Sequence, residues 1–208
     1  IRGAFPEHTI LSEESHAHER PGEYCWIVDP LDGTTNYAHG LPIFSASLGL
    51  EIDGEAVLGA VFDATRQELF VAERGAGATL NGEPIHVSSA TGLGQSMLCT
   101  GFPYDIHQSR ADVVGLFSEF VGVCRAVRRL GSAALDLCYV AAGRFDGFWE
   151  ARLKPWDTCA GALMVQEAGG AVSRWDGGPY QSRANGLVAS NGVVHDAMLG
   201  VIRDFGER

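Results

Sequence analysis

The sequence has little positive charge: 15 Lys and Arg residues stand against 26 Asp and Glu, which gives a formal net charge of −11 over 208 residues. Sequence-independent binding of nucleic acid needs a basic surface, so this balance argues against nucleic-acid partners. No apolar run approaches the roughly 18 residues that a membrane span needs. If the ligand is an anion, an acidic protein of this kind needs cations to hold it.

Paired cysteine motifs are also missing. The five cysteines are odd in number, form no C-x-x-C pair and sit among apolar neighbours, which predicts buried free thiols and a cytoplasmic location. The first residues, IRGAFPEHTI, contain neither an initiator Met nor a signal-peptide pattern. We therefore expect that an N-terminal segment precedes Ile1 in the full-length protein.

Residues 1–94 show the patterns of an antiparallel sheet. Apolar and polar residues alternate over 44–52, which predicts a half-buried strand with Phe44, Ala46, Leu48, Leu50 and Ile52 on its apolar face. Asp53-Gly54 is a hairpin signal before the next strand, 55–63, and residues 68–73 continue the meander.

Residues 95–208 alternate strands with helices, which is typical of an α/β arrangement. Helices are predicted over 110–121, after an N-cap at Ser132, and after an N-cap at Asp157. A strand at 145–150 and another at 187–191 precede a C-terminal helix. No linker or repeat separates the two halves, so we expect one compact unit.

Carboxylates gather at the predicted ends of strands and starts of helices. Asp29 and Asp32 follow the apolar run Trp26-Ile27-Val28, and Glu13-Glu14, Glu150 and Asp157 occupy comparable places. Each alone has an ordinary explanation as a solvated loop, a turn or an N-cap. Together, hard carboxylate oxygens around a small gap favour Mg²⁺.

Gly33-Thr34-Thr35 follows this acidic pair directly. A helix or turn that starts there would offer free backbone N–H groups to phosphate oxygens, and the glycine would let the backbone approach closely. Mg²⁺ ions would also allow an acidic protein to hold an anion. The residues therefore indicate a Mg²⁺-dependent phosphoryl-group hydrolase.

Longer motifs resemble one known family. DPLDGTTNY (29–37) and WDTCAGALMVQEAGG (156–170) are similar to the two signature motifs of the inositol monophosphatase family, D-P-[ILV]-D-G-T-x-N-[FY] and W-D-x-A-A-G-x-x-[ILV]-x-x-E-A-G-G. SEES (12–15) resembles the family's G-E-E-S, and GSAALDLCYVAAG (131–143) resembles its G-[ST]-A-A segment. The resemblance covers almost the whole chain.

The resemblance implies a layered α-β-α-β-α sandwich, with the N-terminal helices apparently absent from this chain. It implies Mg²⁺-dependent, Li⁺-sensitive hydrolysis of phosphate monoesters by a homodimer. Glu13, Asp29 and the carbonyl of Leu31 would bind a first metal ion, and Asp29, Asp32 and Asp157 a second, within a site for two or three ions.

The remaining roles also follow from the resemblance. Gly33 and Thr34 would hold the phosphate through backbone N–H groups, while Thr34 and Glu13 would orient the attacking water. Asp32 and Asp157 would lie against the substrate, whose alcohol part would contact Gly131, Ser132, Ala133 and Glu150. The family's acidic partner of the Thr34 hydroxyl comes from the N-terminal region that is absent here.

Several alternatives remain open. The substrate is expected to be inositol monophosphate, with fructose-1,6-bisphosphate, histidinol phosphate and 3′-phosphoadenosine 5′-phosphate as rivals. Some bacterial members of the family instead work by binding a partner in the transcription machinery, and a structural cation-binding module is a third possibility. The basic patch RAVRRLG (125–131) either steers anionic substrate or lies in solvent. His16 and His18 are interpreted as loop residues rather than zinc ligands.

Overall fold

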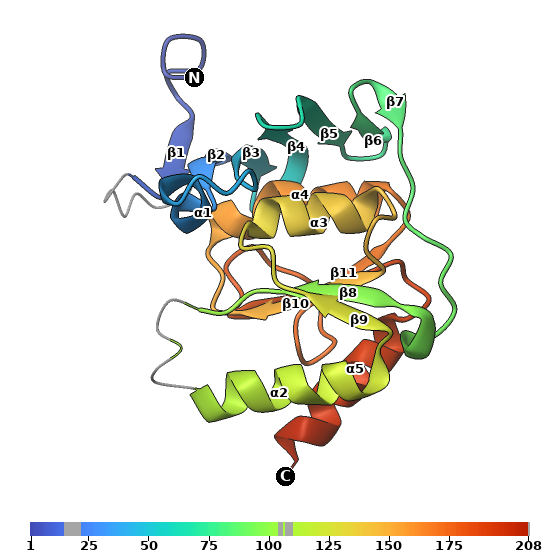
Figure 1. Cartoon of the computed structure of the whole chain (residues 1–208). Coiled ribbons are helices and arrows are strands. Elements are labelled where there is room, and N and C mark those ends of the chain that lie inside the picture. The colour runs from blue at the N-terminus through green and yellow to red at the C-terminus, as the bar shows by residue number, and fades with distance from the viewer. Residues whose placement is uncertain (15–21, 104–105, 107–109, 208) are drawn as a thin grey trace.

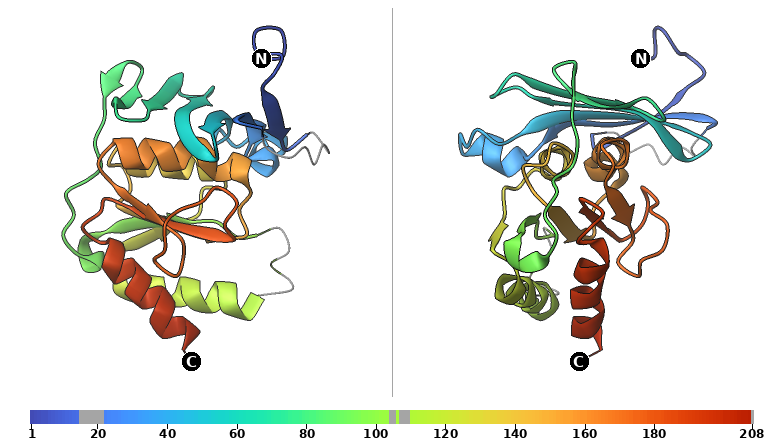
Figure 2. Two further views of the ribbon diagram at one scale, coloured as in Figure 1. Left: turned by 180° about the vertical axis from the view of Figure 1, so that it is seen from behind. Right: turned by 90° about the vertical axis from the view of Figure 1, so that its right-hand side faces the viewer.

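A computed structural model describes residues 1–14, 22–103, 106 and 110–207 of the chain. Ser15, His16 and His18, which belong to motifs considered above, lie outside these residues. The described part forms four layers: a large sheet, a pair of helices, a smaller sheet and a second pair of helices (Figure 1). Two further views show the same stacking (Figure 2).

The large sheet is built from the first part of the chain, with its strands in sequence order. All neighbouring strands are antiparallel except β1 and β2, which run parallel. The predicted antiparallel meander is therefore present, and the prediction missed only the parallel first strand and the short strands. The strands are β1 (Thr9–Ser12), β2 (Tyr24–Asp32), β3 (Ser45–Ile52), β4 (Glu55–Asp63), β5 (Glu68–Glu73), β6 (Gly77–Leu80) and β7 (Glu83–Pro84).

The smaller sheet has the order β11-β12-β10-β8-β9 and mixes parallel with antiparallel pairs. Such non-sequential order requires crossover connections, which the helices of the second half supply. The strands are β8 (Met97–Thr100), β9 (Ala126–Arg128), β10 (Gly147–Ala151), β11 (Ala171–Ser173) and β12 (Gly186–Ser190).

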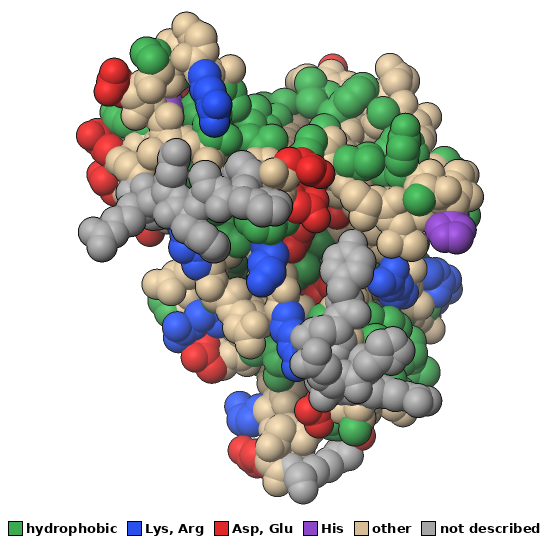
Figure 3. Space-filling view, turned by 90° about the vertical axis from the view of Figure 1, so that its left-hand side faces the viewer, with side chains coloured by type: hydrophobic (Ala, Val, Ile, Leu, Met, Phe, Trp, Pro, Cys, Tyr) green, Lys and Arg blue, Asp and Glu red, His purple; other side chains and the backbone are tan. Residues whose placement is uncertain are grey.

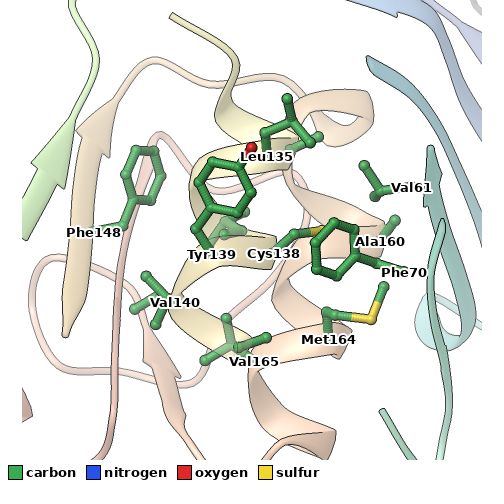
Figure 4. Packing of buried hydrophobic residues seen from close by; sticks show 14 of the residues in the cluster. Val61, Phe70, Leu135, Cys138, Tyr139, Val140, Phe148, Ala160, Met164 and Val165 are labelled. Atoms are coloured by element: carbon green, nitrogen blue, oxygen red, sulfur yellow. The ribbon is translucent and has the colours of Figure 1, made fainter. Parts of the chain in front are cut away.

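Helices α3 (Ala133–Ala141) and α4 (Pro155–Glu167) lie between the two sheets and contact both. Val61 and Phe70 of the large sheet and Phe148 of the smaller one close on their side chains from either side (Figure 4). Helices α2 (Arg110–Val123) and α5 (His195–Gly206) cover the other face of the smaller sheet. The short helices are α1 (Thr34–Ala38) and the 3₁₀ turn η1 (Leu93–Gln95).

Strand β3 packs on the helices with the face that carries its small and polar residues, not with the face that carries its large apolar residues. Ser45, Ser47, Gly49 and Glu51 are buried, whereas the apolar residues between them are only half-buried or exposed. Helix α4 comes so close that a Cβ on Gly49 would lie 2.6 Å from the Cys159 Sγ. The alternation shows which residues share a face, but the small residues decide which face the helix can approach.

The same close approach gives a stability prediction at Gly59 on β4. A Cβ there would lie 2.9 Å from the carbonyl oxygen of Ala160 and 3.0 Å from its Cα, and these backbone atoms cannot rotate away. We expect Gly59→Ala to lower the free energy of unfolding by about 1–3 kcal/mol in urea titrations. Gly122→Ala, on an open part of α2, is the control and should be neutral or slightly stabilising. Equal stability of both variants would contradict close packing of α4 on the sheet.

Among the described residues, no helix covers the outer face of the large sheet. The division of the chain at residues 94 and 95 stays a prediction, although the strands of the large sheet end at Pro84 and those of the smaller sheet begin at Met97. Within the described ranges, no helix combines the length and apolarity needed to cross a membrane.

Candidate active site

The two carboxylates at the end of β2 share one side of the strand because of a bulge. Asp29 pairs with Ser47 and Asp32 with Ser45, so three steps along β2 match two along β3. In a regular strand, residues three apart point to opposite faces. The extra residue removes this opposition, and Pro30, which has no N–H to donate, fits such an irregular position.

Asp157 brings a third carboxylate from the first turn of α4. One carboxylate oxygen from each of Asp29, Asp32 and Asp157 lies within 4.8 Å of the others. The sequence predicted Asp157 as the N-cap of this helix, and this prediction is wrong. Asp157 is the third residue of the helix. Lys154 occupies the N-cap, and its backbone N–H donates to the Asp157 Oδ2 at 2.6 Å. Three hard oxygen donors at this spacing fit a divalent cation.

Glu13 follows β1 at the same edge of the sheet, because β1 runs parallel to β2 and Ser12 pairs with Val28. Its backbone N–H donates to the Val28 carbonyl at 3.3 Å. The exposed Glu13 carboxylate is not one of the three clustered groups, but its charge contributes to raising the pKa of each of them. Leu31 lies beside them, with its N–H donating to the Asp29 Oδ1 at 2.9 Å.

Burial and the charges of neighbouring acids raise the pKa values of the three clustered aspartates. Burial, and then the charge of Asp32, raises the pKa of Asp29 to about 8. Burial raises the pKa of Asp157 to about 7, against the hydrogen bond from Lys154. Burial also raises the pKa of Asp32, to about 6, and hydrogen bonds from Ser132 and Ala134 oppose this rise. A bound cation would displace these protons, and its positive charge would offset the repulsion between the ionised carboxylates.

Asp32 also fixes the start of α3. Its Oδ2 accepts from the Ser132 hydroxyl at 2.6 Å and from the Ala134 N–H at 2.9 Å. Ser132 has the N-cap position that the sequence predicted, but its side chain makes no cap hydrogen bond, since the hydroxyl donates to Asp32. The carboxylate of Asp32 therefore takes over the capping role and ties α3 to the end of β2.

The Gly33-Thr34 turn opens a short helix, α1, as predicted. Gly33 is its N-cap with φ 86°, a left-handed conformation that favours glycine, and a Cβ there would lie 2.9 Å from the Ile43 carbonyl oxygen. The first N–H groups of a helix have no partner within it. Asn36 links this turn to the loop before α3, because its side-chain amide donates to the carbonyls of Ile43 and Leu130, each at 2.8 Å.

The carboxylates and the turn open into one cavity of about 460 Å³. Acidic side chains line a hollow in the surface between the two sheets, and Lys or Arg side chains border it (Figure 3). On β10, Glu150 reaches the cavity at 8% exposure, and burial, followed by the charge of Asp157, raises its pKa to about 8. Among the predicted residues, the cavity is lined by Glu13, Asp29, Leu31, Asp32, Gly33, Thr34, Glu150 and Asp157.

Gly131, Ser132 and Ala133 line a smaller, adjoining cavity instead. No motif marks several other residues that line the larger cavity, namely Phe102, Pro103, Arg152, Lys154 and Asn185, whereas Trp156 begins the motif at 156–170. Of the basic patch, residues 126–128 form β9, while Arg129 lines the smaller cavity and places its guanidinium 5.7 Å from the centre of the Phe102 ring. The patch is therefore divided between a strand and the site.

A model of the inositol monophosphatase family matches residues 1–207. Nus factor SuhB of Escherichia coli strain K12 is 45% identical over 205 residues, which cover 98% of this chain and 77% of that protein. Inositol-1-monophosphatase of Synechocystis is 43% identical over 199 residues, with 95% of this chain and 69% of that protein covered.

Solved structures agree with these matches. The structure of inositol monophosphatase from Anabaena (Nostoc) superposes with a TM-score of 0.95 at 43% identity, covering 98% of this chain and 81% of that one. The sandwich fold class predicted from the sequence is thereby confirmed, and the acidic cluster suits the metal dependence of the family. The chain belongs to the inositol monophosphatase family and is a phosphatase.

Proposed function

We propose that the chain hydrolyses a small phosphate monoester of a polyol, with inositol monophosphate as the foremost substrate and Mg²⁺ as the bound cation. The observation that carries this proposal is the convergence of Asp29, Asp32 and Asp157 within 4.8 Å beside the N-terminus of α1, in an open cavity. The name of the Synechocystis relative, inositol-1-monophosphatase, favours inositol monophosphate among the possible esters.

Asp29, Asp32 and Asp157, with Glu13 and the Leu31 carbonyl, would hold two or three Mg²⁺ ions. When bound, the ions would lower the pKa of a water molecule and stabilise the developing charge on the phosphate and the leaving oxygen. Of the ligand carboxylates, the three clustered aspartates are the more buried, whereas Glu13 is exposed.

The chain's own residues would position the ester. Backbone N–H groups of Gly33 and Thr34 would bind phosphate oxygens, and the Thr34 hydroxyl and Glu13 would orient the attacking water. Glu150, whose pKa burial raises to about 8, would bind a substrate hydroxyl, as an acceptor in either state and also as a donor when protonated. Because the Ser132 hydroxyl donates to Asp32, we assign Ser132 the role of holding that carboxylate.

Homodimerisation and a cytoplasmic location are part of the same proposal. Five unpaired cysteines, four of them buried, suit a reducing compartment. The net charge of −11 supports a role without nucleic-acid or membrane partners.

Phosphate release from a substrate panel tests the proposal. Inositol-1-phosphate, fructose-1,6-bisphosphate, histidinol phosphate and 3′-phosphoadenosine 5′-phosphate should be offered with Mg²⁺, with a chelator, and with Mg²⁺ plus Li⁺. We expect the highest kcat/KM for inositol-1-phosphate, no release with the chelator, and inhibition by Li⁺. A higher kcat/KM for another ester would reassign the substrate, and the absence of release from all four would contradict the proposal.

Partner binding is a second candidate function, because the Escherichia coli relative is named a Nus factor rather than an enzyme. A capture experiment with the wild type and Asp29→Asn separates the two roles. If the same defined partner is retained at equal yield by the variant while phosphate release is lost, then binding does not depend on catalysis. Loss of both together would indicate that the partner recognises the metal-loaded site.

A further inference from the structure

A second, smaller cavity of about 80 Å³ adjoins the larger one. The two share Asp32, Phe102, Glu150, Leu153 and Asp157 in their linings, so the smaller cavity extends the site away from the acidic cluster. A water-sized group needs about 10–15 Å³, so the smaller cavity has room for several such groups.

Asp136, on α3, lines this smaller cavity and is 1% exposed. Its Oδ1 is buried and has no hydrogen-bond partner, a state that only one other side-chain atom, Ser45 Oγ, shares in the described part of the chain. Burying a carboxyl oxygen without a partner is unfavourable, so such a group calls for an explanation. All residues of α3 are buried, so bulk solvent does not reach Asp136 from the helix side.

Glu150 lines the same cavity, and the lack of a side chain at Gly101 leaves room for its carboxyl group. A Cβ on Gly101 would collide with the Glu150 carboxyl group. Burial, followed by the charges of Glu150 and Asp32, raises the pKa of Asp136 well above its ordinary value, while Arg129 acts in the opposite direction. Two buried carboxyl groups therefore meet at this cavity, and their raised pKa values favour the protonated forms, which offer a donor O–H and an acceptor oxygen.

The character of the cavity favours a neutral hydroxyl as its occupant. Two further carboxylates in its lining, Asp32 and Asp157, disfavour an anion. The positive charge of Arg129, which also lines the smaller cavity, disfavours a cation there. A hydroxyl group donates one hydrogen bond and accepts others, and so it can satisfy a carboxyl oxygen in either protonation state.

We propose that Asp136 is a second substrate-contacting acid, which binds, together with Glu150, two neighbouring hydroxyl groups on the alcohol part of the substrate. The inference rests on the proposed function, since the phosphate must be held at the acidic cluster for the alcohol part to reach this cavity. It adds a preference for esters of polyols with adjacent hydroxyls over esters of simple alcohols. A substrate hydroxyl would supply the hydrogen-bond partner that the Asp136 Oδ1 does not find among the described residues.

The test compares Asp136→Leu with Asp136→Asn in the complete protein. Asp136→Asn is the matched control, because the amide still donates and accepts hydrogen bonds, whereas the side chain of Asp136→Leu does neither. For inositol-1-phosphate we expect Asp136→Leu to raise KM at least tenfold and Asp136→Asn to raise it less than threefold. For p-nitrophenyl phosphate, whose alcohol part has no neighbouring hydroxyls, both variants should keep kcat/KM within twofold of the wild type.

The melting temperature distinguishes a substrate-binding role of Asp136 from a merely structural one, because the two roles predict changes of opposite sign in Asp136→Leu. Removing the unpartnered carboxyl should raise the melting temperature of ligand-free Asp136→Leu by about 2–4 °C. If Asp136 serves packing alone, the Leu variant should melt at a lower temperature and keep the wild-type KM. That pair of results would overturn the inference, as would an equal loss of kcat/KM on both substrates.

A binding measurement keeps the inference independent of turnover. Binding of myo-inositol in the presence of Mg²⁺ and inorganic phosphate can be followed by ligand-observed NMR. Weaker binding to Asp136→Leu than to wild type supports the inference even if neither ester is hydrolysed, a result that would reject only the proposed function. Equal binding to both proteins rejects the inference even if the wild type is an active phosphatase.

Discussion

Asp29→Asn is expected to lower kcat by about 1000-fold and, at the same time, to stabilise the metal-free protein. The loss follows from removing a buried oxygen ligand, because a bound cation contributes several kcal/mol of transition-state stabilisation and each 1.36 kcal/mol is a factor of ten in rate. Asp29 is the cleaner position for this test than Asp32, whose carboxylate also holds the start of α3.

The gain in stability follows from the raised pKa of Asp29, about 8 in the folded protein. In the unfolded chain an aspartate loses its proton near pH 4, whereas the folded protein keeps it up to about pH 8. The unfolded state therefore binds fewer protons in this window, so the stability of the metal-free protein falls as pH rises through it. An amide cannot ionise, so the variant should show a shallower decline.

Urea unfolding in the presence of a chelator, at pH 5 and pH 8, measures this difference, and phosphate release measures kcat. Asp53→Asn is the matched control, because Asp53 is an exposed carboxylate in the β3–β4 turn with φ 51°, a conformation that Asn tolerates. It should change neither quantity. Retained turnover in Asp29→Asn would remove Asp29 from the ligand set, and a steeper decline of stability with pH would contradict its raised pKa.

The local patterns of the sequence predicted the elements well, because each depends on neighbouring residues. Strands β3, β4 and β5 and helices α3 and α4 lie within a few residues of their predicted positions. Asp53 and Gly54 both adopt positive φ, as the hairpin signal requires. Gly143 and Gly169, at φ 68° and 89°, follow the ends of α3 and α4 in the left-handed conformation that commonly ends a helix.

Features set by distant contacts were the ones that the sequence did not reveal. The parallel pairing of β1 with β2 places Glu13 beside Asp29, and no local pattern indicates it. The alternation in β3 did not reveal which face packs on the helices, because that face is chosen by α4, about 110 residues further along the chain. Asp136 was overlooked, although a single acid within the apolar run AALDLCYV is a detectable signal of a buried polar group.

Mg²⁺ binding is expected to release protons and to strengthen steeply with pH. With pKa values of about 8, 7 and 6 for Asp29, Asp157 and Asp32, the metal-free cluster holds between one and two protons at pH 7. A cation must displace them, since only ionised carboxylates are good ligands. Each proton released multiplies the apparent affinity by about ten per pH unit, so a rise of about 10–100-fold is expected from pH 6.5 to pH 7.5.

Isothermal titration calorimetry with Mg²⁺ in two buffers of different ionisation enthalpy counts the protons directly. Asp29→Asn should release fewer protons than the wild type, because Asp29 has the highest pKa of the three. Asp53→Asn should match the wild type. An affinity that stays constant between pH 6 and pH 8 would mean that the three aspartates are already ionised without a cation. Their mutual repulsion would then be relieved within the protein itself, and the cluster would not require a divalent ion.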